Sequence, residues 1–191
     1  ASRPVASGRV SRKVAWAWLG TLCLIGLVVL LQLRWQAQLV ALGSLALVAA
    51  YPFMKRITWW PQAWLGMVFT WGAPVAWVAL RSDHWEVLAA LYAGSILWCV
   101  GYDTIYALQD REDDALVGIR SSALRMGTHV KGGVGLCYAL AVAFWALALW
   151  LMRDDALALL GLVPAAIHLA WQVLTLNTED GDNALARFRS N

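Results

Sequence analysis

The stretch VLAALYAGSILWCVGYDTIYALQDREDD, from Val87 to Asp114, decides what kind of protein this is. Its first sixteen residues, Val87 to Tyr102, carry no charge, and Asp103 then opens a segment with five acids in twelve residues. A carboxylate at the end of a membrane-length apolar helix costs about 2.5–3.5 kcal/mol if it sits deep in a bilayer, so such acids usually have a function. We therefore expect the working centre of the protein at this segment.

The rest of the chain has the same apolar character. Of its 191 residues, 61% are apolar and 14% are charged, whereas a soluble domain usually has about 25% charged residues. A membrane-spanning helix needs about 20 apolar residues. Six runs reach or approach that length: Val14–Leu33, Trp35–Met54, Ile57–Leu80, Trp85–Gln109, Gly132–Met152 and Ala156–Thr178. The sequence predicts an all-α, multi-pass transmembrane helical bundle with six spans, embedded in the lipid bilayer.

Basic residues give the orientation. If the N-terminus is cytoplasmic, 12 of the 15 Lys and Arg residues fall on the cytoplasmic side of the six spans. The remaining three are Arg34, Arg81 and Arg153. This bias follows the positive-inside rule and predicts that both chain ends are cytoplasmic. Because the basic residues serve topology, the net charge of +3 does not indicate nucleic acid binding.

The acids after the fourth run could hold a metal ion. Asp103, Asp110 and Asp114 are seven and then four residues apart, so they share one helical face if the helix continues through them. Mg²⁺ favours carboxylate oxygens and completes its shell with water and substrate phosphates. We expect these three aspartates to hold Mg²⁺, while Glu112 and Asp113 are equally well explained as a solvated loop.

A second candidate group is the YPFMKR segment, Tyr51 to Arg56, at the cytoplasmic end of the second run. Lys55 and Arg56 are on the same side as the acids, where they could clamp a diphosphate from the side opposite the metal. The alternative is that both only fix topology, with side chains that reach up to the interface.

Weaker signals lie on the same side. RPVASGR contributes Arg3 and Arg9, and GIRSSA contributes Arg120, Ser121 and Ser122. The three cysteines and three histidines show no metal-ligand spacing. Cys23, Cys99 and Cys137 lie in apolar runs and are interpreted as packing residues, and His168 as a hydrogen-bonded core residue.

In this order and spacing, YPFMKR, YDTIYALQDREDD and GIRSSA resemble the UbiA superfamily of membrane prenyltransferases. The opening RPVASGRVS resembles the segment after that family's first aspartate-rich motif, and NALARFRSN resembles the stretch before its last helix. The resemblance covers essentially the whole chain and is strongest to the 4-hydroxybenzoate-prenylating subgroup of ubiquinone biosynthesis.

The resemblance implies a nine-helix fold around a central cavity, in which two aspartate-rich motifs hold Mg²⁺ and an allylic diphosphate. It makes Asp103, Asp110 and Asp114 the catalytic and metal-binding residues. It also implies a polyprenyl diphosphate donor and an aromatic acid acceptor. The substrate-binding candidates are Tyr51, Lys55, Arg56, Arg3 and Ser121, with the acceptor carboxylate assigned to either Arg56 or Arg3.

By the same resemblance, residues 1–191 are one domain that is incomplete at both ends. The first motif, N-D-x-x-D-x-x-x-D, and two helices would precede Ala1, and one helix would follow Asn191. We expect no catalysis from the chain as given. The resemblance also places the protein in the bacterial inner membrane rather than the mitochondrial one, with its active site facing the cytoplasm.

Other readings stay open. Haem-, chlorophyll- and menaquinone-type prenyltransferases belong to the same superfamily. A transporter should show polar residues at mid-depth and a repeat of broken helices, and the sequence indicates neither. A CDP-alcohol phosphotransferase should carry D-G-x-x-A-R, which is absent from the sequence.

Overall fold

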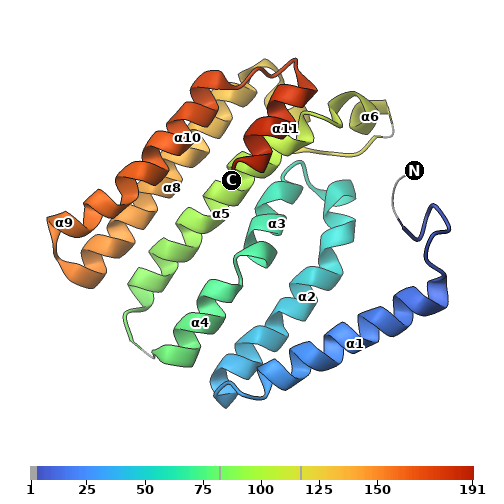
Figure 1. The fold of residues 1–191 in the computed structure, drawn as a ribbon. Helices are drawn as coiled ribbons and strands as arrows, with labels where there is room; N and C mark the ends of the chain where they lie inside the picture. The colour runs from blue at the N-terminus through green and yellow to red at the C-terminus, as the bar shows by residue number, and fades with distance from the viewer. Residues whose placement is uncertain (1–3, 82, 117) are drawn as a thin grey trace.

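The computed structural model describes residues 4–81, 83–116 and 118–191, and within these ranges all regular structure is helical. Figure 1 shows the helices in chain order. They are α1 (Arg12–Leu30), α2 (Trp35–Ile57), α3 (Pro61–Phe69), α4 (Gly72–Leu80), α5 (Trp85–Ala107), α6 (Arg111–Leu116), α7 (Ser122–Met126), α8 (Val130–Arg153), α9 (Ala156–Leu159), α10 (Val163–Thr175) and α11 (Gly181–Arg189). Two short 3-10 turns, Gly127–His129 and Leu160–Leu162, join α7 to α8 and α9 to α10.

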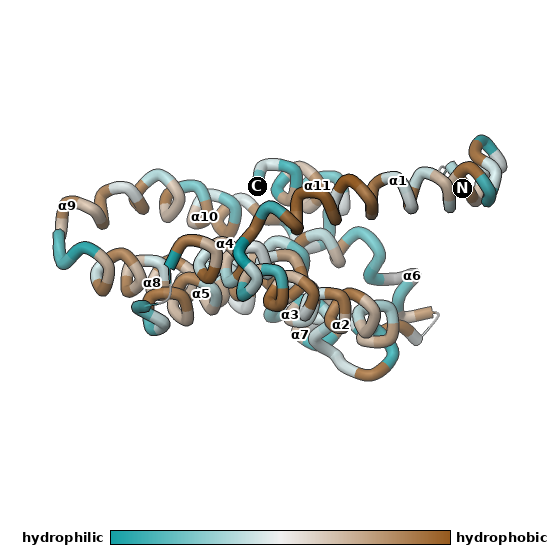
Figure 2. The backbone as a smooth tube through the Cα atoms, turned by 90° about the horizontal axis from the view of Figure 1, so that it is seen from below, coloured by the Kyte–Doolittle hydropathy of each residue, from teal (hydrophilic) through white to brown (hydrophobic). Residues whose placement is uncertain are grey.

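Six helical segments are long and apolar enough to cross a membrane, which confirms the predicted multi-pass bundle. Large apolar side chains cover their outer surface, among them Leu80 at 84% exposure, Leu174 at 74% and Trp16 at 72%. A soluble protein rarely exposes so large an apolar surface. In a bilayer these side chains meet lipid, and Figure 2 shows hydrophobic positions along the outer helices.

Local signals start the helices. Ser11 Oγ accepts a hydrogen bond from the Val14 N–H at 3.3 Å and caps α1. Asp180 Oδ1 accepts from the N–H groups of Asp182 and Asn183, both at 3.0 Å, and caps α11. Each cap satisfies N–H groups that have no partner within their helix.

Two spans are interrupted near a proline, which the sequence analysis did not anticipate. The third span breaks at Thr70 and Trp71, between α3 and α4, because Pro74 lacks an N–H and its ring clashes with the carbonyl of Thr70, four residues earlier. The sixth span contains the 3-10 turn Leu160–Leu162 just before Pro164. Neither break carries a charged side chain.

The fourth span also differs from its predicted length. The run to Gln109 is helical only as far as Ala107, and the chain turns through Leu108–Asp110 before α6 begins at Arg111. The predicted continuous helix through Asp103, Asp110 and Asp114 is therefore wrong.

Helix α5 is the centre of the bundle. It packs most extensively on α8 and also contacts α3, α4, α7 and α11. Its glycines make the close approach possible, since a Cβ on Gly101 would come within 2.3 Å of the Tyr138 ring. Seen from below, α1, α10 and α11 lie to one side of the layer that contains α2, α3, α5 and α8 (Figure 2).

Tryptophan side chains fasten the helices within the bilayer. The Nε1–H groups of Trp64 and Trp71 donate to the carbonyls of Leu47 and Val40 on α2, each at 2.8 Å. Trp98 packs on Tyr102, with ring centroids 4.8 Å apart. These tryptophans thus contribute to packing within the bundle.

Helix α11 folds back onto α5, and the Trp98 Nε1–H donates to Asn191 Oδ1 at 3.0 Å. Asn191 itself is exposed. The cytoplasmic location of the C-terminus stays a prediction. Figure 1 shows the C-terminus beside α5 and the N-terminal segment at the end where α6 lies.

Candidate active site

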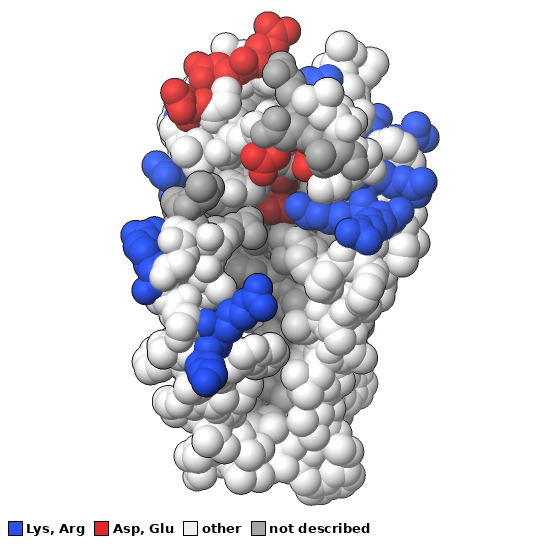
Figure 3. Space-filling model, turned by 90° about the vertical axis from the view of Figure 1, so that its right-hand side faces the viewer, with Lys and Arg blue, Asp and Glu red and all other residues white. Residues whose placement is uncertain are grey.

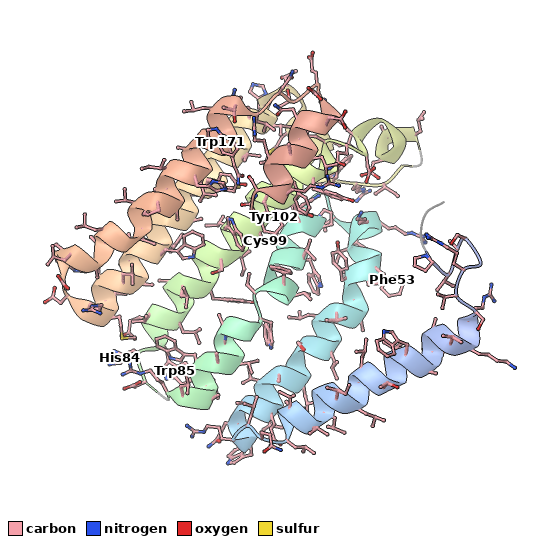
Figure 4. All side chains as sticks on the ribbon, viewed as in Figure 1. Phe53, His84, Trp85, Cys99, Tyr102 and Trp171 are labelled. Carbon is pink, nitrogen blue, oxygen red and sulfur yellow. The ribbon has the colours of Figure 1, made fainter. Side chains whose placement is uncertain are left out.

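The end of the bundle that holds α6 also holds the candidate residues. Figure 3 shows acidic side chains in a hollow of this face, with Lys and Arg side chains on both sides of it. Figure 4 places Tyr102 at this end of α5, near α11, whereas His84 and Trp85 lie at the other end of α5. The candidate acids and the end of α2 that carries Lys55 thus lie at one end of the bundle.

Asp103 is half-buried in the last turns of α5. Its carboxylate is close enough to the Lys55 ammonium and to the Tyr51 hydroxyl to interact with both electrostatically. Tyr51 and Lys55 are one helical turn apart on α2. The structure therefore brings together Asp103 and the YPFMKR segment, which are about fifty residues apart in sequence.

Asp110 and Asp114 lie on the next element. The Asp114 N–H donates to the Asp110 carbonyl oxygen at 2.7 Å, so the two residues are one turn apart at the start of α6. Asp110 is exposed and Asp114 is half-buried. The pair shares one face of a short helix, but the turn at Leu108–Asp110 separates it from the helix that carries Asp103.

This arrangement limits the kind of metal site that the protein can offer. Among the described residues, no three His, Cys, Asp or Glu side chains form a group that could hold a metal ion by themselves. The side chains of Glu112 and Asp113 lie outside the described part of the chain. Mg²⁺ commonly uses one or two carboxylates and takes its other ligands from water and substrate phosphates. Asp110 and Asp114 fit a site of this kind, in which two carboxylates hold Mg²⁺ and water and substrate phosphates supply the other ligands.

The remaining substrate-binding candidates have different surroundings. Arg56 is exposed at the end of α2, beside Lys55. Ser121 is 2% exposed, and its Oγ accepts from the Leu124 N–H at 3.3 Å as the N-cap of α7. The structure thus gives Ser121 a local capping role. Arg3 lies outside the described residues.

Aromatic rings line α5 around Asp103. Phe188 of α11 packs on Tyr102 and Tyr106, with ring centroids 5.7 Å and 4.7 Å apart. Phe69 meets Tyr102 edge-on at 6.2 Å. Helix α11 therefore braces the turn of α5 that presents Asp103.

Two buried polar residues beside the site, Gln62 and Thr104, were not among the candidates named from the sequence. The Gln62 side chain is 3% exposed, and its Oε1 accepts from the Ser122 N–H at 3.1 Å. The hydroxyls of Ser122 and Thr104 hydrogen-bond to each other, and both side chains are fully buried. The sequence did carry a signal for Gln62: this glutamine directly follows Pro61 in an apolar run, and a buried side-chain amide needs hydrogen-bond partners.

A separate polar network joins α8, α10 and α11. Gln172 is fully buried, and its Oε1 accepts from the Tyr138 hydroxyl at 2.8 Å and from Asn191 Nδ2 at 3.2 Å. Its Nε2 donates to Ser190 Oγ at 3.1 Å and lies 2.9 Å from His168 Nε2. His168 is thus hydrogen-bonded, as predicted, but it is half-buried and lies outside the core.

The opposite face of the membrane carries ordinary surface ion pairs. Arg81 Nε donates to Asp83 Oδ1 at 2.9 Å, and this hydrogen bond holds the pKa of the Asp83 carboxyl below its usual range. His84 Nδ1 lies 3.2 Å from Glu86 Oε1. Both pairs are exposed and contribute little to stability.

Comparison with known proteins identifies the family. The model of the UbiA prenyltransferase family matches residues 1–191. A protein of Drosophila melanogaster named "4-hydroxybenzoate polyprenyltransferase, mitochondrial" is 39% identical over 192 residues, which is 99% of this chain and 48% of that protein. The protein of the same name from Aedes aegypti is 38% identical over 208 residues, or 100% of this chain and 43% of that protein.

A bacterial relative has a similar identity. The "4-hydroxybenzoate octaprenyltransferase" of Pseudomonas fluorescens (strain SBW25) is 36% identical over 196 residues, or 99% of this chain and 64% of that protein. The chain spans about half the length of most of the curated relatives it matches. No solved structure matches it. With its predicted bundle confirmed and a family match along its whole length, the chain belongs to the UbiA prenyltransferase family.

Proposed function

We propose that this chain is part of a membrane enzyme that transfers a polyprenyl group from a polyprenyl diphosphate to 4-hydroxybenzoate, in ubiquinone biosynthesis. The relatives bearing that name support the acceptor. The single observation that carries the chemistry is the electrostatic interaction of Asp103 on α5 with Lys55 and Tyr51 on α2. Basic and acidic groups facing each other are what a diphosphate and its counter-ion need.

The cationic half of the site acts on the leaving group. Breaking the allylic C–O bond leaves additional negative charge on the diphosphate, and both bond electrons go with it. Lys55 and Arg56 are fixed at the end of α2, where they stabilise that charge as it develops. Tyr51, one turn earlier, can donate its hydroxyl proton in a hydrogen bond to a phosphate oxygen.

The acidic half holds the counter-ion in this proposal. Asp110 and Asp114 present carboxylates one turn apart, and Asp103 presents a third from α5. Mg²⁺, when bound, supplies Lewis-acid stabilisation of phosphate oxygens. Its remaining ligands would come from the substrate and from water.

The acceptor ring supplies the electrons for the new bond. The allylic cation is attacked by the ring carbon ortho to the phenol oxygen, and loss of the proton on that carbon restores aromaticity. Water would quench the cation, and the aromatic wall of Tyr102, Tyr106 and Phe188 helps to exclude it. Arg56 or Arg3 would hold the acceptor carboxylate.

The proposal extends to location. The protein would lie in the bacterial inner membrane, with the hollow facing the cytoplasm, since most of the Lys and Arg residues belong to that side. The mitochondrial inner membrane is the alternative, since the names of the eukaryotic relatives contain the word mitochondrial. We expect no catalysis from residues 1–191 alone.

The test uses the full-length protein. Membranes containing it are incubated with 4-hydroxybenzoate, a polyprenyl diphosphate and Mg²⁺, and the expected result is prenylated 4-hydroxybenzoate that disappears when Mg²⁺ is chelated. Turnover of a naphthoate, haem or chlorophyll-type acceptor instead would reassign the enzyme within its family. Uptake of a solute without any prenylated product would support the transporter reading.

A further inference from the structure

The C-terminal end of α2 is completed by a residue far away in the sequence. The last four carbonyls of a helix have no partner within it. The Thr58 N–H donates to the Met54 carbonyl. Arg120 satisfies two of the other carbonyls: its backbone N–H donates to the Lys55 carbonyl at 3.0 Å, and its Nη1 donates to the Ile57 carbonyl at 2.8 Å.

The Arg120 side chain is held in this position. Its guanidinium carbon lies 5.4 Å from the centroid of the Trp59 ring, just after α2. A cation at a helix C-terminus also interacts favourably with the helix dipole. Arg120 is therefore the cap of the helix that carries Tyr51 and Lys55, although 63 residues separate it from Ile57.

A second contact fixes the same segment from its other side. The Ser122 N–H donates to Gln62 at the start of α3, and the Ser122 hydroxyl meets that of Thr104 on α5. Thr104 directly follows Asp103. The segment after α6 is thus tied to the α2–α3 corner and to the turn of α5 next to the acid.

We infer that Arg120 is a positioning residue, which holds the basic end of α2 and the aspartates of α5 and α6 in one geometry for a diphosphate. The inference rests on the proposed function, because it assumes that the two charged halves grip one diphosphate. Arg120 acts through its neighbours, because its guanidinium is already occupied: Nη1 donates to the Ile57 carbonyl, and the group stacks on the Trp59 ring.

The experiment compares three variants of the full-length protein in lipid nanodiscs. Arg120→Lys keeps the positive charge but loses the planar guanidinium, which hydrogen-bonds to the Ile57 carbonyl and stacks on Trp59 at the same time. Trp59→Leu removes the stacking surface without a change of charge. Arg125→Lys is the matched control, because Arg125 is exposed on α7 in the same region.

Two readouts need no turnover. Hydrogen exchange is followed at the backbone amides of Arg120 and Ser122, whose N–H groups donate to the Lys55 carbonyl and to Gln62 Oε1. The dissociation constant for inorganic diphosphate is measured with Mg²⁺ present. Arg120→Lys and Trp59→Leu are each expected to speed exchange about tenfold at these amides and to raise the dissociation constant about tenfold, as loss of a charged hydrogen bond or its support would do. Arg125→Lys should change neither by more than about twofold.

Several outcomes would overturn the inference. Unchanged exchange in Arg120→Lys would show that the cap does not hold the segment. Faster exchange with unchanged diphosphate binding would remove the positioning role. Weaker binding in Arg120→Lys alone, with Trp59→Leu unaffected, would make Arg120 a direct phosphate ligand instead. Faster exchange along the whole chain would indicate general destabilisation. If prenylation of 4-hydroxybenzoate fails while both readouts behave as expected, the proposed acceptor is wrong and the positioning role stands.

Discussion

At the scale of single residues, charge is concentrated where two helices end. Asp103 is near the end of α5, and Lys55 is near the end of α2. Each lies in a span whose other residues are almost all apolar; Asp103 is half-buried there and Lys55 is exposed. A half-buried carboxylate interacts more strongly with nearby charge than one in water, because its surroundings screen it less. Under the proposed function, this interaction would help a small number of side chains to organise a diphosphate.

The aspartate pair of α6 gives the first prediction. Asp110→Asn and Asp114→Asn in the full-length protein should each lower the transfer rate by at least about a hundredfold, since each removes a carboxylate charge facing the counter-ion of the diphosphate. The measurement is prenyl transfer in membranes at equal protein levels. Asp182→Asn is the control, because Asp182 lies in the first turn of α11 and its side chain is exposed. Full activity in either α6 variant would remove that residue from the site.

Gln172 gives the second prediction. Its side chain takes part in four hydrogen bonds, one to His168 within α10 and three that join α10 to α8 and to the end of α11. Hydrogen bonds between membrane helices contribute about 0.6 kcal/mol each on average, so Gln172→Leu should lower stability by about 2 kcal/mol. Thermal denaturation of the detergent-solubilised protein measures this.

Gln32 supplies the comparison for Gln172. It is exposed and makes one local bond, to the Val28 carbonyl at 3.4 Å. Gln32→Leu should therefore change stability by less than about 0.5 kcal/mol. Equal effects of the two substitutions would mean that the buried network contributes nothing beyond the change in hydropathy.

At the scale of elements, packing depends on glycines that face a large side chain. Gly101→Ala on α5 would bring a methyl group into the Tyr138 ring of α8, at the most extensive interface of the bundle. Overpacking of this kind costs about 1–3 kcal/mol. It should also disturb the bond from Tyr138 to Gln172, so we expect a lower melting temperature and reduced transfer.

A glycine in open space is the control for Gly101. A Cβ on Gly132, near the start of α8, would meet nothing within 4 Å. Because Ala is the better helix former by up to about 1 kcal/mol, Gly132→Ala should be neutral or stabilising. A Gly101→Ala protein as stable as the parent would show that α5 and α8 can separate at no cost.

The sequence predicted the spans well and their interruptions poorly, for a physical reason. Apolar runs are set by the thickness of the bilayer, so length alone located all six. The end of α5 at Ala107 is set by tertiary contacts of the next segment, among them the Arg120 cap on α2. No local signal marks that end, since Leu108, Gln109 and Asp110 are all compatible with a helix. The registry of Asp103 with Asp110 and Asp114 therefore could not be predicted from spacing.

Residues that meet across the bundle show the same limit. The segment YPFMKR and Asp103 were each recognisable as candidates from their sequence, because charge at the end of an apolar run is unusual. That Lys55 lies near Asp103, and that Arg120 caps α2, depends on how α3 places the two helices. Such pairings come from the fold, which a single sequence specifies only indirectly.

At the scale of the whole molecule, the asymmetry of charge defines an orientation that can be measured. Helix α6 and the α10–α11 loop lie at one end of the bundle, and the α1–α2 turn lies at the other (Figure 1). Under the positive-inside rule the end with α6 is cytoplasmic. Glu179 is exposed in the α10–α11 loop, and Gln32 is exposed in the α1–α2 turn.

Cysteine labelling distinguishes the two ends. Glu179→Cys should react with a membrane-impermeant maleimide only in inside-out vesicles, and Gln32→Cys only in right-side-out vesicles. The native Cys23, Cys99 and Cys137 all lie within spans, and the parent protein measures their background. The reverse pattern would put the diphosphate site on the outer face. A cytoplasmic enzyme could then not deliver a water-soluble acceptor to it directly, and the proposed location would have to be abandoned even if the chemistry were correct.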